Sequence, residues 1–171
     1  MTPQAWRRLV AILATAVVAV GGLVGCGKDE FADRSVVVKL GGSNVTYDVE
    51  ACGLDGQTVF VLAEAPDGAL LQGVMGLEED DKTGIPESTG VTVDLDPTTD
   101  DSRVAAFGPE AWERRGSTGP PPGSIASARL RGSRIQFSGT VVSVDADDQP
   151  VGAAGGEQEF SVDARCDQVE D

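Results

Sequence analysis

The sequence has no histidine, few aromatic residues and no apolar run long enough for a membrane-spanning helix. Without histidine the chain cannot build a Ser-His-Asp or Cys-His nucleophile, and it lacks the commonest transition-metal ligand. A Ser-Lys nucleophile is not indicated either, because none of Lys28, Lys39 and Lys82 lies in a Ser-x-x-Lys arrangement. The longest apolar run, residues 9–24, is shorter than the roughly 20 residues that span a bilayer. We therefore expect a non-enzymatic protein without a cofactor or a bound metal.

Basic residues are also scarce. There are 13 of them against 28 acidic residues, which gives a formal net charge of −15, and they form no cluster along the sequence. Nucleic acid is a poor partner for such a chain, because no group of cations is available to displace counterions from phosphates. Peripheral binding to an anionic bilayer is disfavoured for the same reason. Arginine outnumbers lysine, and Ala, Val, Gly and Asp abound, which is typical of a high-GC genome such as that of an actinobacterium.

Residues 1–25 have the pattern of a signal peptide: two cations, Arg7 and Arg8, an apolar run, and small residues before Cys26. Leu23-Val24-Gly25-Cys26 resembles the bacterial lipobox, in which the cysteine thiol receives diacylglycerol and the chain is cut before it. The alternatives are a plain signal peptide or an uncleaved anchor with a chance cysteine. The arginine pair is compatible with either the general secretory or the twin-arginine route. We predict lipidation at Cys26 and a location on the extracytoplasmic face of the cell membrane.

After this segment the sequence predicts a short tether, residues 26–34, and one globular domain, residues 35–171. Short segments of alternating polarity, separated by Gly and Pro turns, predict a mostly β domain, an antiparallel β-sandwich or barrel. Residues 78–89 are predicted to form an acidic loop, 109–114 a short helix, and 115–124 an exposed Pro-rich loop. The predicted strands cover residues 36–40, 44–52, 58–63, 69–75, 90–96, 125–130, 134–144 and 157–166.

Two thiols remain once Cys26 is acylated. An even pair in an exported domain predicts a disulfide between Cys52 and Cys166, since a redox-active pair would need close spacing. One detail conflicts with simple alternation. Cys52 falls on the polar face of its predicted strand, whereas Cys166 falls on the apolar face of its own. A bulge or a strand end at Cys52 would remove the conflict.

The chain resembles the mycobacterial 19-kilodalton lipoprotein antigen family. The likeness rests on the lipobox, the cysteine pair, residues 49–61, and residues 129–166 with the motifs Ile135-Gln136-Phe137-Ser138-Gly139-Thr140 and Glu159-Phe160-Ser161-Val162. The resemblance implies export, lipidation, display in the envelope and recognition by host innate receptors, with no catalytic residues. Members of the family typically carry a long glycosylated Ser/Thr-rich tether. Residues 27–34 are short and contain neither Ser nor Thr, so the sequence departs from the family at this point.

Acidic clusters are the remaining candidate sites. A calcium ion needs six to eight oxygens that converge from a loop. No cluster has the spaced EF-hand pattern, so solvated charge is the better interpretation. The clusters are Glu78-Glu79-Asp80-Asp81; Asp94 with Asp96, Asp100 and Asp101; and Asp145-Asp147-Asp148.

The sequence therefore predicts a lipid-anchored envelope protein that acts as a surface antigen or interaction protein. Its expected partners are the membrane, reached through the lipid anchor, and another envelope protein. The alternative is a carrier that holds an apolar lipid or glycolipid between its sheets.

Overall fold

The computed structural model describes residues 34–79, 83–96, 98–99, 102–151 and 156–166. The predicted signal peptide, Cys26 and nearly all of the tether lie outside these ranges. Nine strands and one short helix make up the regular structure that is described. In chain order they are β1 (Ser35–Leu40), β2 (Ser43–Asp55), β3 (Thr58–Glu64), β4 (Leu70–Leu77), β5 (Gly84–Asp94), β6 (Arg103–Phe107), α1 (Pro109–Arg114), β7 (Ser124–Arg131), β8 (Arg134–Ser143) and β9 (Gln158–Arg165).

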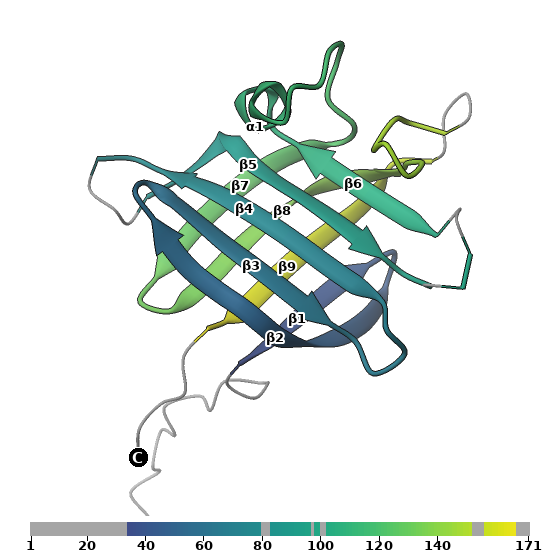
Figure 1. The fold of residues 1–171 in the computed structure, drawn as a ribbon, viewed down its shortest axis with the longest axis horizontal. Helices are drawn as coiled ribbons and strands as arrows, with labels where there is room; N and C mark the ends of the chain where they lie inside the picture. The colour runs from purple at the N-terminus through teal and green to yellow at the C-terminus, as the bar shows by residue number, and fades with distance from the viewer. Residues whose placement is uncertain (1–33, 80–82, 97, 100–101, 152–155, 167–171) are drawn as a thin grey trace, which may run out of the picture. The chain divides into compact units, whose positions relative to one another are not determined.

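The strands form a closed antiparallel barrel, one of the two predicted architectures. Their order is β6-β5-β4-β3-β2-β1-β9-β8, and β8 returns to β6 through Val104↔Ser143 and Ala105↔Val142. The same edge of β8 also pairs with β7, which reaches β5 through the bridge Thr83↔Arg129. Figure 1 views the barrel from the side of β2 to β6, with β7, β8, β9 and β1 in the far wall.

Side chains fill the barrel interior. The alternation seen in the sequence places the apolar face of each strand inward. Val36 of β1 lies beside Tyr47 of β2, and Val38 lies beside Val162 of β9, with all four side chains buried in the core. Gly73 lies inside β4 for a packing reason. A Cβ at this position would lie 3.1 Å from Cζ of Phe137, so the absence of a side chain makes room for that ring.

Two predicted boundaries are wrong. β2 continues past Cys52 to Asp55, and the turn is Asp55-Gly56-Gln57, with Gly56 at a φ of 57°. β5 begins at Gly84, so residues 84–89 belong to a strand and only the first part of the predicted acidic loop is a turn. The buried polar residues Ser88 and Thr89 gave this segment the composition of a loop. In the structure, the Thr89 hydroxyl donates to the Ile85 carbonyl at 2.7 Å.

The helix α1 has the predicted bounds and packs on the outside of the barrel rather than within it. Ala111 and Trp112 cover Ala105 and Phe107 of β6, and together with Val144 they form a second, smaller core. The Pro-rich loop that follows is exposed only in part, because Pro122 is buried and its carbonyl accepts the Phe107 amide at 3.0 Å. No helix within the described ranges is long and apolar enough to cross a membrane.

Candidate interaction surface

A disulfide joins Cys52 of β2 to Cys166, the residue after β9, as the sequence predicted. The two Cα atoms are 5.7 Å apart, within the usual range for a disulfide, and 114 positions separate them in the chain. The bond therefore links two strands that lie on either side of β1. The Cys166 amide donates to the carbonyl of Ser133 in the β7–β8 turn at 3.1 Å, so the bond lies at the end of the barrel that carries this turn, which we call the disulfide end.

A bulge in β2 turns Cys52 toward the core. The register between β2 and β3 shifts between Val49 and Ala51, so Glu50 is an extra residue in the ladder. Before the bulge Val49 faces inward, and after it Cys52 and Leu54 do so, opposite Val61 and Val59 of β3. A bulge was one of the two features predicted from the sequence that would allow Cys52 and Cys166 to face the same side.

The disulfide end has a small apolar mouth. Its volume is about 220 Å³, and Cys52, Leu54, Val59, Leu130, Ile135 and Cys166 supply most of its apolar lining. Leu54 is 56% exposed, the highest value among the large apolar side chains that are described. Sites for small molecules usually have volumes of about 300–1,000 Å³ and bury most of the ligand. The mouth is smaller than this range. A larger hollow of about 610 Å³ lies between the β1–β2 turn and the start of β9, but charged, polar and glycine residues, among them Lys39, Glu157 and Glu159, make up most of its lining. Neither hollow is an apolar chamber of that size.

A row of three arginines runs along the outside of the barrel next to this mouth. Register places Arg165 of β9 beside Arg134 of β8, and Arg134 beside Arg131 of β7. On the other side of Arg165 lies Ser35, the first residue of β1. Gly132 and Ser133, which line the mouth, connect Arg131 to Arg134, and Cys166 follows Arg165. The arginine row therefore borders the apolar mouth directly.

The outward positions of β1, β9, β8 and β7 form a basic face. It contains five of the nine Lys and Arg residues described: Lys39, Arg129, Arg131, Arg134 and Arg165. Two acidic residues, Glu159 and Asp163, lie on the same face. Arg134 binds Asp163 through two hydrogen bonds, Nε to Oδ1 at 2.8 Å and Nη2 to Oδ2 at 2.6 Å, and Gln136 adds a third. Among the described residues this face thus carries five cations and two carboxylates.

The opposite wall carries the opposite charge. Strands β2, β3, β4 and β5 contain no Lys or Arg, and their acidic residues include Asp48, Asp55, Glu64 and Asp94. The sequence has no cluster of cations, but the barrel makes one by placing four strands side by side. The strands of these two walls therefore differ in charge.

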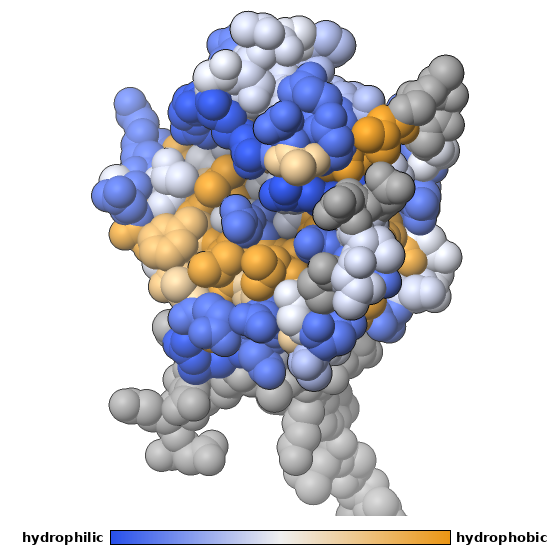
Figure 2. Space-filling model, turned by 45° about the vertical axis from the view of Figure 1, so that its right-hand side comes forward, coloured by the Kyte–Doolittle hydropathy of each residue, from blue (hydrophilic) through white to orange (hydrophobic). Residues whose placement is uncertain are grey.

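Part of the outer surface of β3 and β4 is apolar. Phe60 pairs with Val74, and these residues are 39% and 37% exposed, while Leu70 is 40% exposed. Figure 2 shows apolar side chains gathered across the middle of this side of the molecule, with hydrophilic side chains around them. This patch is a second surface on which another protein could pack.

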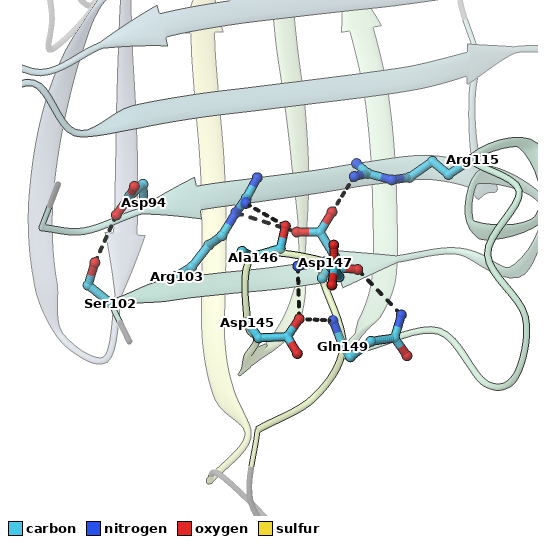
Figure 3. A network of polar contacts seen from close by, with 9 residues as sticks. Asp94, Ser102, Arg103, Arg115, Asp145, Ala146, Asp147 and Gln149 are labelled. Carbon is cyan, nitrogen blue, oxygen red and sulfur yellow. Dashed lines mark hydrogen bonds and ion pairs between the residues drawn. The ribbon is translucent and has the colours of Figure 1, made fainter. Parts of the chain in front are cut away.

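A buried ion cluster fastens α1 to the barrel. Asp148 is 2% exposed and binds Arg115 through its Oδ2, while Nε of Arg103 lies 3.4 Å from Oδ1. The Arg115 guanidinium also covers the ring of Phe107, 4.9 Å from its centre. Figure 3 shows Arg103 and Arg115 approaching the loop after β8 from two directions. The cluster holds this loop, β6 and the end of α1 together, which is a structural role.

The described residues of the acidic clusters do not converge on a common point. Oδ1 of Asp145 accepts the amides of Asp147 and Gln149, both at 2.9 Å (Figure 3). Asp148 instead binds Arg115 and lies close to Arg103. Asp94 accepts the Ser102 hydroxyl at 2.8 Å, and Asp96 binds Thr98. Asp80, Asp81, Asp100 and Asp101 lie outside the described residues. In the ranges that are described, no group of three or more acidic or cysteine side chains could hold a metal ion.

The basic face is the feature that sequence reasoning missed. Its arginines occupy polar positions in or beside three predicted strands, and these positions were the only indication of a basic face in the sequence. The order of the strands was needed to bring them together, because residues 129–134 and 165 meet only through the pairing of β8 with β9.

No protein-family model matches the chain, and a search of curated proteins finds no match.

Proposed function

We propose that the chain is a lipid-anchored lipoprotein of the bacterial cell envelope that works as a non-enzymatic interaction protein. The lipobox at Leu23-Val24-Gly25-Cys26 supports the anchor, and the disulfide supports export, since such bonds persist in oxidising compartments. On this proposal Cys26 is the first residue of the mature protein. The domain then lies on the extracytoplasmic face of the cell membrane.

The observation that carries the interaction role is the contrast between the inside and the outside of the barrel. The interior is packed with apolar side chains, and the mouth at the disulfide end measures about 220 Å³. The outside, by contrast, carries a basic face, an acidic wall and an apolar patch. Such a surface suits contacts with partners better than the storage of a lipid.

Membrane fractionation and intact mass measurement test the anchor. The wild-type protein, expressed in a bacterial host that processes lipoproteins, should lie in the membrane fraction and carry a diacylglyceryl group on Cys26. The Cys26→Ala variant should lack this group and should not be cut before residue 26. Removing the other two thiols with Cys52→Ala and Cys166→Ala is the matched control and should leave the acylation intact. A Cys26→Ala protein that is still membrane-bound and correctly processed would show that the anchor is wrong.

Native mass spectrometry distinguishes the interaction role from the carrier role. The domain prepared without its acyl anchor should give the mass of the protein alone. Retention of a lipid or glycolipid in stoichiometric amount would favour the carrier instead.

A further inference from the structure

We infer that the arginine row and Leu54 at the disulfide end form a docking surface for the anionic phospholipid headgroups of the membrane that holds the anchor. This inference rests on the proposed anchoring at Cys26, because the tether brings this end of the barrel to the bilayer. The occupant is thus an anionic membrane surface, bound by arginine side chains and one exposed leucine.

The point where the tether joins the barrel is well defined. The Val49 amide donates to the Arg34 carbonyl at 2.9 Å, and the Arg34 guanidinium donates to the Val49 carbonyl, also at 2.9 Å. These bonds attach the start of β1 to β2, and the next residue, Ser35, lies beside Arg165 in the arginine row. Residues 27–34, fully extended, reach at most about 28 Å. An anchor at Cys26 therefore keeps the arginine row close to the membrane.

The net charge of −15 disfavours binding of the domain as a whole to an anionic bilayer, but the uneven distribution of its charge favours docking through this one side of the barrel. An anionic leaflet attracts basic side chains that lie near its surface, and the attraction decays over a Debye length of about 8 Å at physiological ionic strength. Opposite walls of a packed barrel are about 10 Å apart, and the outward side chains increase the distance between the two outer surfaces further. When the β7-β8-β9 side faces the bilayer, the acidic residues of β2 to β5 are largely screened from it.

The apolar mouth adds the second component of a membrane-binding surface. Peripheral proteins bind by combining basic residues with apolar side chains that enter the headgroup region. Leu54 is more than half exposed beside the mouth, and Arg131 lies next to Leu130 of the mouth lining. Asp55, the last residue of β2, and Glu78, the residue after β4, are exposed on the β2–β4 side of the same end. The barrel should therefore dock tilted toward β7, β8 and β9.

Arginine-specific labelling tests this inference on the whole processed protein. The lipidated protein is reconstituted in vesicles of phosphatidylcholine alone and in vesicles that also contain phosphatidylglycerol. It is then treated with phenylglyoxal and mapped by mass spectrometry. Arg129 and Arg131, both exposed, should react about fivefold more slowly in the anionic vesicles, and high salt should abolish the difference. Arg114, exposed on α1 outside the basic face, is the internal control and should react equally in both.

Two double variants test whether docking depends on the basic face itself or only on the total charge of the protein. Arg129→Gln with Arg131→Gln lowers the net charge by two, and so does Gln72→Glu in β4 with Gln149→Glu in the loop after β8, two exposed positions outside the basic face and the disulfide end. In anionic vesicles the first pair should remove most of the protection of Arg165, whereas the second pair should preserve it. Thermal unfolding midpoints check that each variant is folded.

The outcomes are distinct. Equal labelling rates at Arg129 and Arg131 in the two kinds of vesicle overturn the docking surface. Protection that depends on protein concentration rather than on lipid charge also overturns it and indicates a second copy of the chain. The intact mass of the same sample reports the acyl group. If the group is missing, the anchored function fails, and labelling with vesicles simply mixed in still decides whether this surface binds them.

Discussion

The ring of Phe107 lies directly on Gly90. The two residues are cross-strand partners in β6 and β5, and a Cβ on Gly90 would overlap Cδ1 of the ring and lie 3.2 Å from its Cγ. Phe107 in turn contacts Trp112, with ring centres 5.3 Å apart, and Arg115 covers the same ring. This contact therefore connects the barrel wall to the helix outside it.

Gly90→Ala should lower the free energy of unfolding by about 1–3 kcal/mol, because the methyl group would push Phe107 off its position. Denaturant unfolding with fluorescence detection measures this change. Gly156→Ala is the matched control, since a Cβ there meets no atom within 4 Å. An equal effect of the two substitutions would contradict the packing role of Gly90.

Asp148→Asn should lower the free energy of unfolding by roughly 1–3 kcal/mol, because it removes the counter-charge of Arg103 and Arg115 at a buried position. The neighbouring substitution Asp147→Asn makes the same chemical change at an exposed position and should alter stability by less than about 0.5 kcal/mol. Chemical denaturation of the two variants gives the comparison. If Asp148→Asn were as mild as its neighbour, the ion cluster would contribute little.

Loss of the disulfide should destabilise the domain by about 2–4 kcal/mol, since the bond closes a long loop in the unfolded chain. The midpoint of denaturant unfolding should fall when a reductant is added to the wild-type protein. In the Cys52→Ala and Cys166→Ala double variant, the midpoint should start low and should not respond to the reductant. A wild-type midpoint that is unchanged by reduction, with free thiols verified by mass, would argue against a stabilising role.

Stability should decrease above pH 10 because of Tyr47. Burial raises the pKa of this phenol to about 12, and the charges of Asp67 and Asp94 act in the same direction. Between pH 10 and 12 the unfolded chain loses the phenolic proton and the folded chain keeps it. The free energy of unfolding should then fall by up to about 2.7 kcal/mol over this interval, and be unaffected by Tyr47 at lower pH.

Tyr47→Phe should flatten the alkaline decrease in stability. The hydroxyl of Tyr47 has no hydrogen-bond partner among the described residues, so its removal should cost little at neutral pH. Tyr47 is the single tyrosine of the chain, which lets the ultraviolet absorbance of tyrosinate report its titration directly. A titration midpoint near 10 in the folded protein would contradict the prediction.

Alternation of apolar and polar residues was sufficient to predict a strand where one face of that strand meets the core and the other meets water. β9 is an example, with Phe160, Val162 and Ala164 inside. It failed for β6, which is buried on both faces because Trp112 covers the outer one. It failed again at the start of β5, where Ser88 and Thr89 are buried and hydrogen-bonded.

The features that the sequence alone determined depend either on neighbouring residues or on the number of residues of one type. Period-two alternation predicted most of the strands and their inward faces, and the number of cysteines predicted the bond between Cys52 and Cys166. Only the tertiary structure decided that β1 lies between β2 and β9, and that Arg131, Arg134 and Arg165 stand in one row. The physical reason is that strand pairing joins residues far apart in the chain. The surface charge of a barrel therefore depends on the order of its strands, which no local pattern records.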